Sequence, residues 1–170
     1  KISIKNLIYL CFPEYEIIFK GEMIYSNIAL SFIEKYPHAD IISNTRIDAL
    51  QNFFKKNNFR YWKRKASIIK EYALKSYPSV NMNDESVSNL SQLARLINQY
   101  QKEIETIKYK LVFLAKKSKY FKPINSLFGI GEFTTSIIIS EIGDINRFNN
   151  IKELTAYCGL DPSIKQSGRS

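Results

Sequence analysis

Two short stretches of the sequence combine residue types that could act on a ligand. One is residues 129–131, with Ile130 between two glycines; the other is residues 166–168, which contain Ser167 and precede Arg169. A glycine-rich turn lets a phosphate approach the backbone, and the N–H groups of the turn and of a following helix can bind that phosphate. A serine hydroxyl is a nucleophile only when a base or a metal ion activates it, and no base accompanies Ser167. From chemistry alone, Ser167 is a turn serine.

Metal and thiol chemistry have little support in the sequence. It contains two cysteines, Cys11 and Cys158, and one histidine, His38, and no pair of them has the spacing of metal ligands. Both cysteines lie among apolar residues, so we expect them to fill the core rather than to react. A disulfide framework is also not expected, which fits a reducing compartment.

The charge balance favours a polyanionic partner without proving one. The chain has 25 Lys and Arg residues against 16 Asp and Glu residues, a net charge of +9 and a pI near 9.4. Such a surface suits DNA, RNA or an anionic membrane, but a merely solvated basic surface is an equally good interpretation. No apolar run approaches the roughly 20 residues that span a bilayer. A hydrophobic content of 45% in 170 residues predicts a folded core in one or two domains.

The pattern of apolar residues predicts an all-α protein that begins with short helices. Glycine is scarce, and the prolines punctuate the chain. We expect helices over residues 23–36, from a Thr45 cap to about Asn57, and from about residue 61 to 75. The last of these carries a basic outer side, formed by Lys63, Arg64, Lys65 and Lys70 beside Tyr61 and Trp62.

A long helix follows, because apolar residues recur at alternating steps of three and four while Gly and Pro are absent from residues 84–117. At 1.5 Å per residue it would be about 50 Å long. Sustained heptads favour a coiled coil that joins two copies of the chain, with an intramolecular hairpin against residues 45–76 as the alternative. Tyr100 in the seam predicts looser packing than a tight parallel zipper. The predicted seam consists of Leu90, Leu93, Ile97, Tyr100, Ile104, Ile107, Leu111 and Leu114.

The C-terminal part has the pattern of a helix-hairpin-helix, with an ordinary tight turn between helices as the alternative. One helix ends near Leu127, residues 129–131 form the turn, and a second helix starts at Glu132. A further short helix over residues 150–157 is capped by Asn149 or Asn150. Contacts of such a hairpin to a DNA or RNA backbone carry no sequence information. The residues expected to bind DNA are Gly129, Ile130, Gly131, Lys119, Lys122, Lys165 and Arg169.

Residues 127–131, 140–148, 154–162 and 166–168 together resemble a known family. In order and spacing they are similar to the C-terminal domain of the insertion-sequence "one-ten" transposases, relatives of the Piv-type DNA invertases. The resemblance implies a recombinase with a two-part active site, in which an N-terminal domain binds Mg²⁺ through acidic residues and the C-terminal domain supplies a nucleophilic serine. That serine falls on Ser167. The family also implies an element-encoded guide RNA and assembly through the coiled coil; upstream of residue 124 only the layout is similar.

The resemblance divides the chain into three regions and implies a fragment of a longer enzyme. Residues 1–80 are a short-helix region after a missing catalytic domain, residues 81–120 a coiled-coil helix, and residues 121–170 a truncated C-terminal domain. No acidic cluster matches the family's metal site, so we expect no cofactor here, Mg²⁺ in the missing domain, and no DNA cleavage by the fragment alone. The expected setting is a bacterial or archaeal cytoplasm, at the nucleoid. The alternatives are a non-catalytic coiled-coil helix-hairpin-helix module that binds nucleic acid, or a decayed element.

Overall fold

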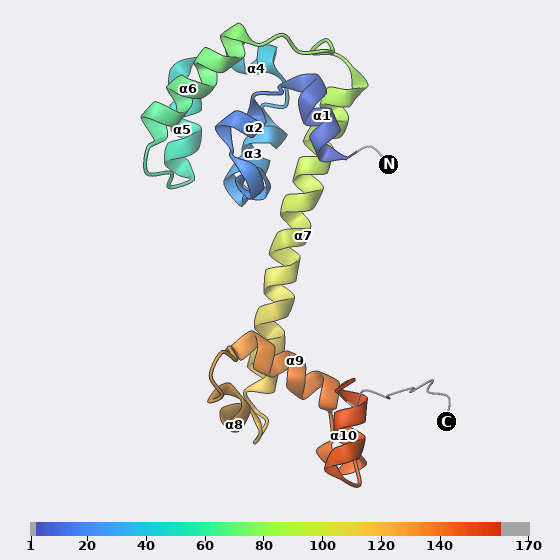
Figure 1. Ribbon diagram of the computed structural model, residues 1–170. Coiled ribbons are helices and arrows are strands. Elements are labelled where there is room, and N and C mark those ends of the chain that lie inside the picture. The colour runs from blue at the N-terminus through green and yellow to red at the C-terminus, as the bar shows by residue number, and fades with distance from the viewer. Residues whose placement is uncertain (1–2, 161–170) are drawn as a thin grey trace, which may run out of the picture. The chain divides into compact units, whose positions relative to one another are not determined.

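The computed structural model describes residues 3–160, and every regular element in that range is a helix (Figure 1). The all-α class expected from the sequence is confirmed. The α-helices are α1 (Ile4–Cys11), α2 (Tyr15–Ile18), α3 (Asn27–Lys35), α4 (Ala39–Asn44), α5 (Ile47–Lys56), α6 (Trp62–Lys75), α7 (Glu85–Ala115), α8 (Phe121–Asn125), α9 (Glu132–Ile142) and α10 (Ile151–Tyr157), with 3-10 turns η1 (Gly21–Tyr25) and η2 (Ile145–Arg147).

The chain divides into two units, residues 1–105 and residues 106–170, and the boundary falls within α7. The N-terminal unit holds the larger core, which aromatic rings dominate. Phe32 lies at its centre, with its ring centroid 5.0 Å from that of Phe54 and 5.3 Å from that of Phe53. Tyr15 is fully buried, and its hydroxyl donates a hydrogen bond to the carbonyl of Tyr36. Burial raises the pKa of Tyr15 well above its ordinary value, so this hydroxyl stays a donor.

Two lysines of α6 point into the N-terminal unit rather than outward. The Lys70 ammonium donates to the carbonyls of Ser43 and Thr45, each at 2.5 Å, and so satisfies acceptors at the C-terminal end of α4. The Lys65 ammonium donates to the carbonyl of Ile18, and burial lowers the pKa of Lys65. The expected basic outer side of this helix is therefore wrong for Lys65 and Lys70, whose charges stabilise the fold.

The expected Thr45 cap is also wrong, because the sequence pattern did not reveal α4. Thr45 is the C-cap of α4, and its hydroxyl donates to the carbonyl of Ile41 at 2.6 Å. Arg46 occupies the N-cap of α5 and makes no side-chain cap bond. Asn57 ends α5 as expected, and Asn58 follows with a positive φ of 55°.

The first half of α7 packs within the N-terminal unit. Leu90 and Ala94 are fully buried. The Ser91 hydroxyl donates to the carbonyl of Glu34 at 2.7 Å, and the Asn98 amide donates to the Ser31 hydroxyl at 2.9 Å. These hydrogen bonds join α7 to α3, outside the 45–76 region that we considered for an intramolecular hairpin. The early seam residues thus have a partner in the same chain.

The second half of the predicted seam is largely open to solvent. Tyr100 is 58% exposed, Ile104 51%, Ile107 64% and Leu114 60%, whereas Leu111 is half-buried. Apolar side chains of this size rarely stay uncovered in a row on a soluble helix. The seam therefore changes character along α7, from a core face to an uncovered stripe.

Cys11 and Cys158 differ in burial. Cys11 is fully buried, and burial together with the nearby Asp84 carboxylate raises its thiol pKa to about 11. Cys158 is exposed, because the helix before it, α10, buries none of its residues. The expectation of a core position is confirmed for Cys11 and wrong for Cys158.

Candidate nucleic-acid interface

The turn between α8 and α9 contains two glycines, Gly129 and Gly131, whose backbone φ angles differ. Gly129 has a φ of +82°, in the left-handed region that side chains other than glycine disfavour. The N–H of Ile130 donates to the carbonyl of Leu127 at 3.1 Å, which closes the turn. Gly131 has an ordinary φ of −89° with ψ of 172°, the extended conformation of an N-cap residue. The second helix starts at Glu132, as expected from the sequence.

The N-terminus of α9 faces open space. No side chain caps it, and the first backward helical bond runs from the N–H of Thr135 to the carbonyl of Gly131 at 2.9 Å. The N–H groups of the first turn therefore lack helical partners. A Cβ atom built on Gly129 or on Gly131 would meet nothing within 4 Å, so the backbone on this side is accessible. Such a terminus attracts anions through its N–H groups and its dipole.

Two contacts hold this helix terminus in place. The Thr135 hydroxyl donates to the Asn125 side-chain oxygen at 3.2 Å, which ties α9 to α8. The Lys116 ammonium lies 2.6 Å from a carboxylate oxygen of Glu132, at the first position of α9. Thr135 and Ser136 are fully buried, so the turn rests on a small packed base rather than on a mobile loop.

The candidate cations of this region divide into paired and available ones. Lys116 is neutralised by Glu132. Lys119 and Lys122 are exposed, on the segment that leads into α8 and in its first turn, and the Lys119 ammonium lies 5.0 Å from the Tyr120 ring centroid. Phe128, at the tip of the turn, projects its whole ring into solvent, which the sequence pattern had not indicated.

The segment after α9 is ordered by its own hydrogen bonds. Gly143 ends α9 with a φ of +62°, and the Asp144 carboxylate accepts from the N–H of Asn146 at 3.0 Å. The Arg147 guanidinium lies 4.6 Å from the ring centroid of Phe148 and 4.5 Å from that of Tyr157. Arg147 thus lies against both rings, a cation–π arrangement that stabilises this segment.

The last described helix starts with reciprocal capping. Asn150 accepts from the N–H of Glu153 at 3.0 Å, and the Glu153 carboxylate accepts from the N–H of Asn149 at 2.8 Å. Gly159 follows α10 with a φ of +71°. Helix, cap and stop agree with the sequence-based expectation.

The comparison with protein families bears on this same region. Residues 122–170 match the model described as Transposase IS116/IS110/IS902 family. The match supports an IS110-family transposase. It spans α8, the glycine turn, α9 and α10 and continues over Ser167. No curated protein and no solved structure matches the chain significantly.

Part of the site expected from the sequence lies outside the described residues. Ser167, Lys165 and Arg169 all belong to that part. Within the described range, the structure places Gly129, Ile130 and Gly131 in one turn and Lys119 and Lys122 on its α8 side. Residues 3–160 contain no group of three or more His, Cys, Asp or Glu side chains arranged to hold a metal ion. None of the described helices is long and apolar enough to cross a membrane.

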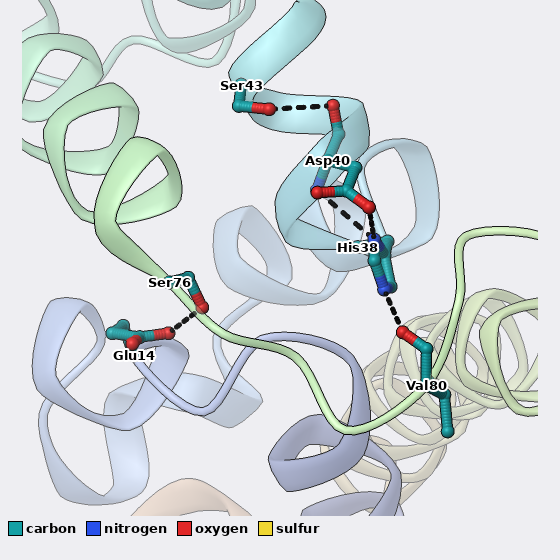
Figure 2. Close-up of polar contacts among 6 residues, drawn as sticks. All are labelled: Glu14, His38, Asp40, Ser43, Ser76 and Val80. Atoms are coloured by element: carbon teal, nitrogen blue, oxygen red, sulfur yellow. Dashed lines mark hydrogen bonds and ion pairs between the residues drawn. The ribbon is translucent and has the colours of Figure 1, made fainter.

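The buried histidine of the chain, His38, is structural. His38 Nδ1 accepts from the N–H of Asp40 at 3.1 Å, and Nε2 donates to the carbonyl of Val80 at 2.9 Å (Figure 2). The Asp40 carboxylate oxygen is 3.5 Å from Nδ1, but a nitrogen that accepts a hydrogen bond carries no proton to pair with it. The Ser76 hydroxyl, also drawn in Figure 2, donates to Glu14 at 2.7 Å. With both ring nitrogens engaged by backbone, His38 has no serine to activate.

Proposed function

We propose that the chain serves as the DNA-binding and assembly part of a transposase that cuts and rejoins DNA. The observation that carries this proposal is the family match over residues 122–170, which coincides with the uncapped, glycine-flanked terminus of α9. In the proposal this terminus binds one phosphate of the DNA backbone, as in a helix-hairpin-helix, and Lys119 and Lys122 bind neighbouring phosphates. Lys165 and Arg169, which lie outside the described residues, are further basic residues that we propose bind DNA.

Two physical features support phosphate binding at α9. The N–H of Ile130 is used within the turn, so the available donors are those of the first turn of α9. Glu132 lies at this terminus but is paired with Lys116, which limits its repulsion of an approaching phosphate. Contacts of this type are independent of base sequence, so the turn would fix the register of the protein on DNA and not its target choice.

In the proposal, Ser167 is the nucleophile of strand exchange. Its hydroxyl oxygen attacks a DNA phosphorus, the phosphodiester bond to the leaving strand breaks, and that strand departs as a hydroxyl after gaining a proton. A serine needs activation for this step, and residues 3–160 contain no group of three or more side chains that could hold a metal ion. In the proposal, the activating group comes from another part of the enzyme. The Mg²⁺ expected for the family does not fit residues 3–160, and we assign it no step here.

We further propose that the transposase acts as a homo-oligomer on DNA, directed by a guide RNA, in the cytoplasm. The uncovered apolar stripe of α7, formed by Tyr100, Ile104, Ile107 and Leu114, supports the contact between copies, because covering it would remove large apolar side chains from water. The guide RNA rests on the family resemblance alone.

The deciding experiment compares the intact transposase with its Ser167→Ala variant, in the presence of guide RNA, Mg²⁺ and donor and target DNA. The proposal predicts that wild type forms a covalent protein–DNA adduct, and that the variant retains DNA binding but loses the adduct. An adduct that persists in the variant would show that Ser167 is a loop serine, and the chain would then be a binding and assembly module.

A further inference from the structure

The connection between α5 and α6 concentrates positive charge without any acidic residue. Between Ala49 and Lys70 the sequence has seven basic residues and no Asp or Glu. Two of the seven, Lys65 and Lys70, are bound to backbone carbonyls inside the unit. The other five are Lys55, Lys56, Arg60, Lys63 and Arg64; all five side chains are exposed, and none forms a salt bridge in the part of the chain described.

Aromatic rings are interleaved with these cations. The ammonium groups of Lys55 and Lys63 lie 5.7 Å and 5.1 Å from the ring centroid of Trp62. The Arg60 guanidinium lies 5.4 Å from that of Tyr61, whose side chain is 61% exposed. Trp62 is partly buried against the core, which restricts the orientation of its ring. The N-terminal unit thus presents aromatic rings that have cations over them.

The surface at these residues has two hollows, and Tyr61 lines both. One hollow of about 280 Å³ is lined by the consecutive residues from Arg60 to Arg64, and a second of about 240 Å³ is lined by Phe59, Tyr61, Arg64, Lys65 and Ile68. Tyr61 and Arg64 line both. Each hollow is wide open and smaller than the roughly 300–1,000 Å³ of small-molecule pockets, which argues against an enclosed cofactor.

We propose that this cluster, residues 59–64 with Lys55, binds an unpaired stretch of nucleic acid, whose bases stack on Tyr61 and Trp62 while its phosphates contact Arg60, Lys63 and Arg64. Cationic side chains interleaved with accessible rings are how proteins hold single strands, because every base has a π face and every nucleotide a charge. The two hollows that share Tyr61 offer places for neighbouring bases beside its ring. The site lies in the N-terminal unit and does not depend on the proposed role of α9.

An unpaired strand fits this surface better than a duplex. In a duplex the faces of the bases are stacked on one another, so rings such as Tyr61 and Trp62 could reach only edges and sugars. Contacts to phosphates alone would involve the cations and not the exposed ring of Tyr61. The preference for unpaired bases is therefore the property that separates this site from general attraction of a basic protein to polyanions.

Trp62 is the single tryptophan of the chain, so its fluorescence reports on this site alone. We would titrate the 170-residue chain with a single-stranded RNA 12-mer, the DNA 12-mer of the same sequence, the corresponding DNA duplex, and an abasic strand of equal charge. The expected result is quenching of Trp62 by an unpaired strand, and little quenching by the duplex or the abasic strand. Quenching by RNA only, or by RNA and DNA alike, would identify which source of unpaired strand the site takes.

Variants separate stacking from charge. Tyr61→Ala removes an exposed ring and keeps the fluorescence of Trp62. It should weaken binding of the unpaired strand about fivefold or more. Arg64→Glu should weaken binding more than Lys5→Glu, a charge change of equal size on α1, across the same unit from the α5–α6 connection (Figure 1). Circular dichroism checks that each variant keeps its helices.

Three outcomes would overturn the proposal: no quenching by either unpaired strand, equal quenching by the duplex, or equal quenching by the abasic strand. None of these outcomes tests phosphate binding at the α9 terminus, because duplex binding there is measured separately, by anisotropy of a labelled duplex. Failure of this site and failure of the proposed function are thus distinguishable.

Discussion

Replacing Gly131 with serine should raise the stability of the C-terminal unit and lower its affinity for DNA. Gly131 already has the extended backbone of an N-cap residue, and its Cβ position is open, so serine fits without strain. The new hydroxyl would accept hydrogen bonds from the first-turn N–H groups of α9, which no side chain caps in the wild type. Those are the same donors that we assign to the DNA phosphate.

The two effects have different sizes. Serine is a better N-cap than glycine by a few tenths of a kcal/mol, which corresponds to an increase in Tm of roughly 1–3 °C for a unit of this size. A hydrogen bond to a charged group contributes about 1.5–3 kcal/mol, so losing it should weaken duplex binding by about tenfold or more. No cation is removed, so the slope of log K against log salt should not change, whereas Lys122→Ala should reduce that slope by about 0.9.

The assay is anisotropy of a labelled duplex at several salt concentrations, together with thermal unfolding of each variant. Gly131→Ala is the matched control, because it adds a Cβ without an acceptor and should lower both stability and affinity. Gly129→Val is less informative, because the φ of +82° at that position makes any side chain strained. A Gly131→Ser variant with raised Tm and unchanged affinity would show that the phosphate does not bind at α9.

Three further results follow from the structure. A maleimide at pH 8 should label Cys158 in the native chain and leave Cys11 unmodified, because the pKa of Cys11 is raised to about 11; equal labelling would contradict the packing of α1. His38→Ala should destabilise the chain by about 1–3 kcal/mol in denaturant unfolding, because it removes the hydrogen-bond donor to the partly buried carbonyl of Val80. An unchanged free energy of unfolding would contradict a structural role for His38. Ile104→Asp should leave helix content unchanged at low concentration and lower the self-association constant in sedimentation; a monomer at all concentrations in wild type would refute the seam.

The parts of the fold that local chemistry dictates were predictable from the sequence. The start of α9 after Gly131 and the cap of α10 at Asn150 depend on residues only a few positions apart. The same holds for α7, whose length follows from an unbroken apolar repeat. In each case the determining residues belong to the element that they define.

The features that escaped prediction depend on residues far apart in the chain. Lys70 lies about 25 positions from the carbonyls it binds, so its inward direction has no local signature. His38 caps α4, and histidine is not among the usual N-cap residues, which hid that helix and misplaced Thr45. The hollows beside Tyr61 are an exception, because the residues that line them, within 59–68, are neighbours in the sequence; the sequence showed that basic and aromatic residues gather there but not how their side chains are placed.

The uncovered stripe on α7 makes the order of that helix depend on protein concentration. From Tyr100 onward much of the stripe lacks tertiary cover, so intrinsic helix propensity supplies most of the stability of this stretch. Amide hydrogens there should exchange rapidly in a single chain and slowly once a second copy covers the stripe, while those around Leu90 should be protected in both states. Hydrogen exchange at two concentrations would therefore measure the free energy of assembly directly on the helix that joins the two units.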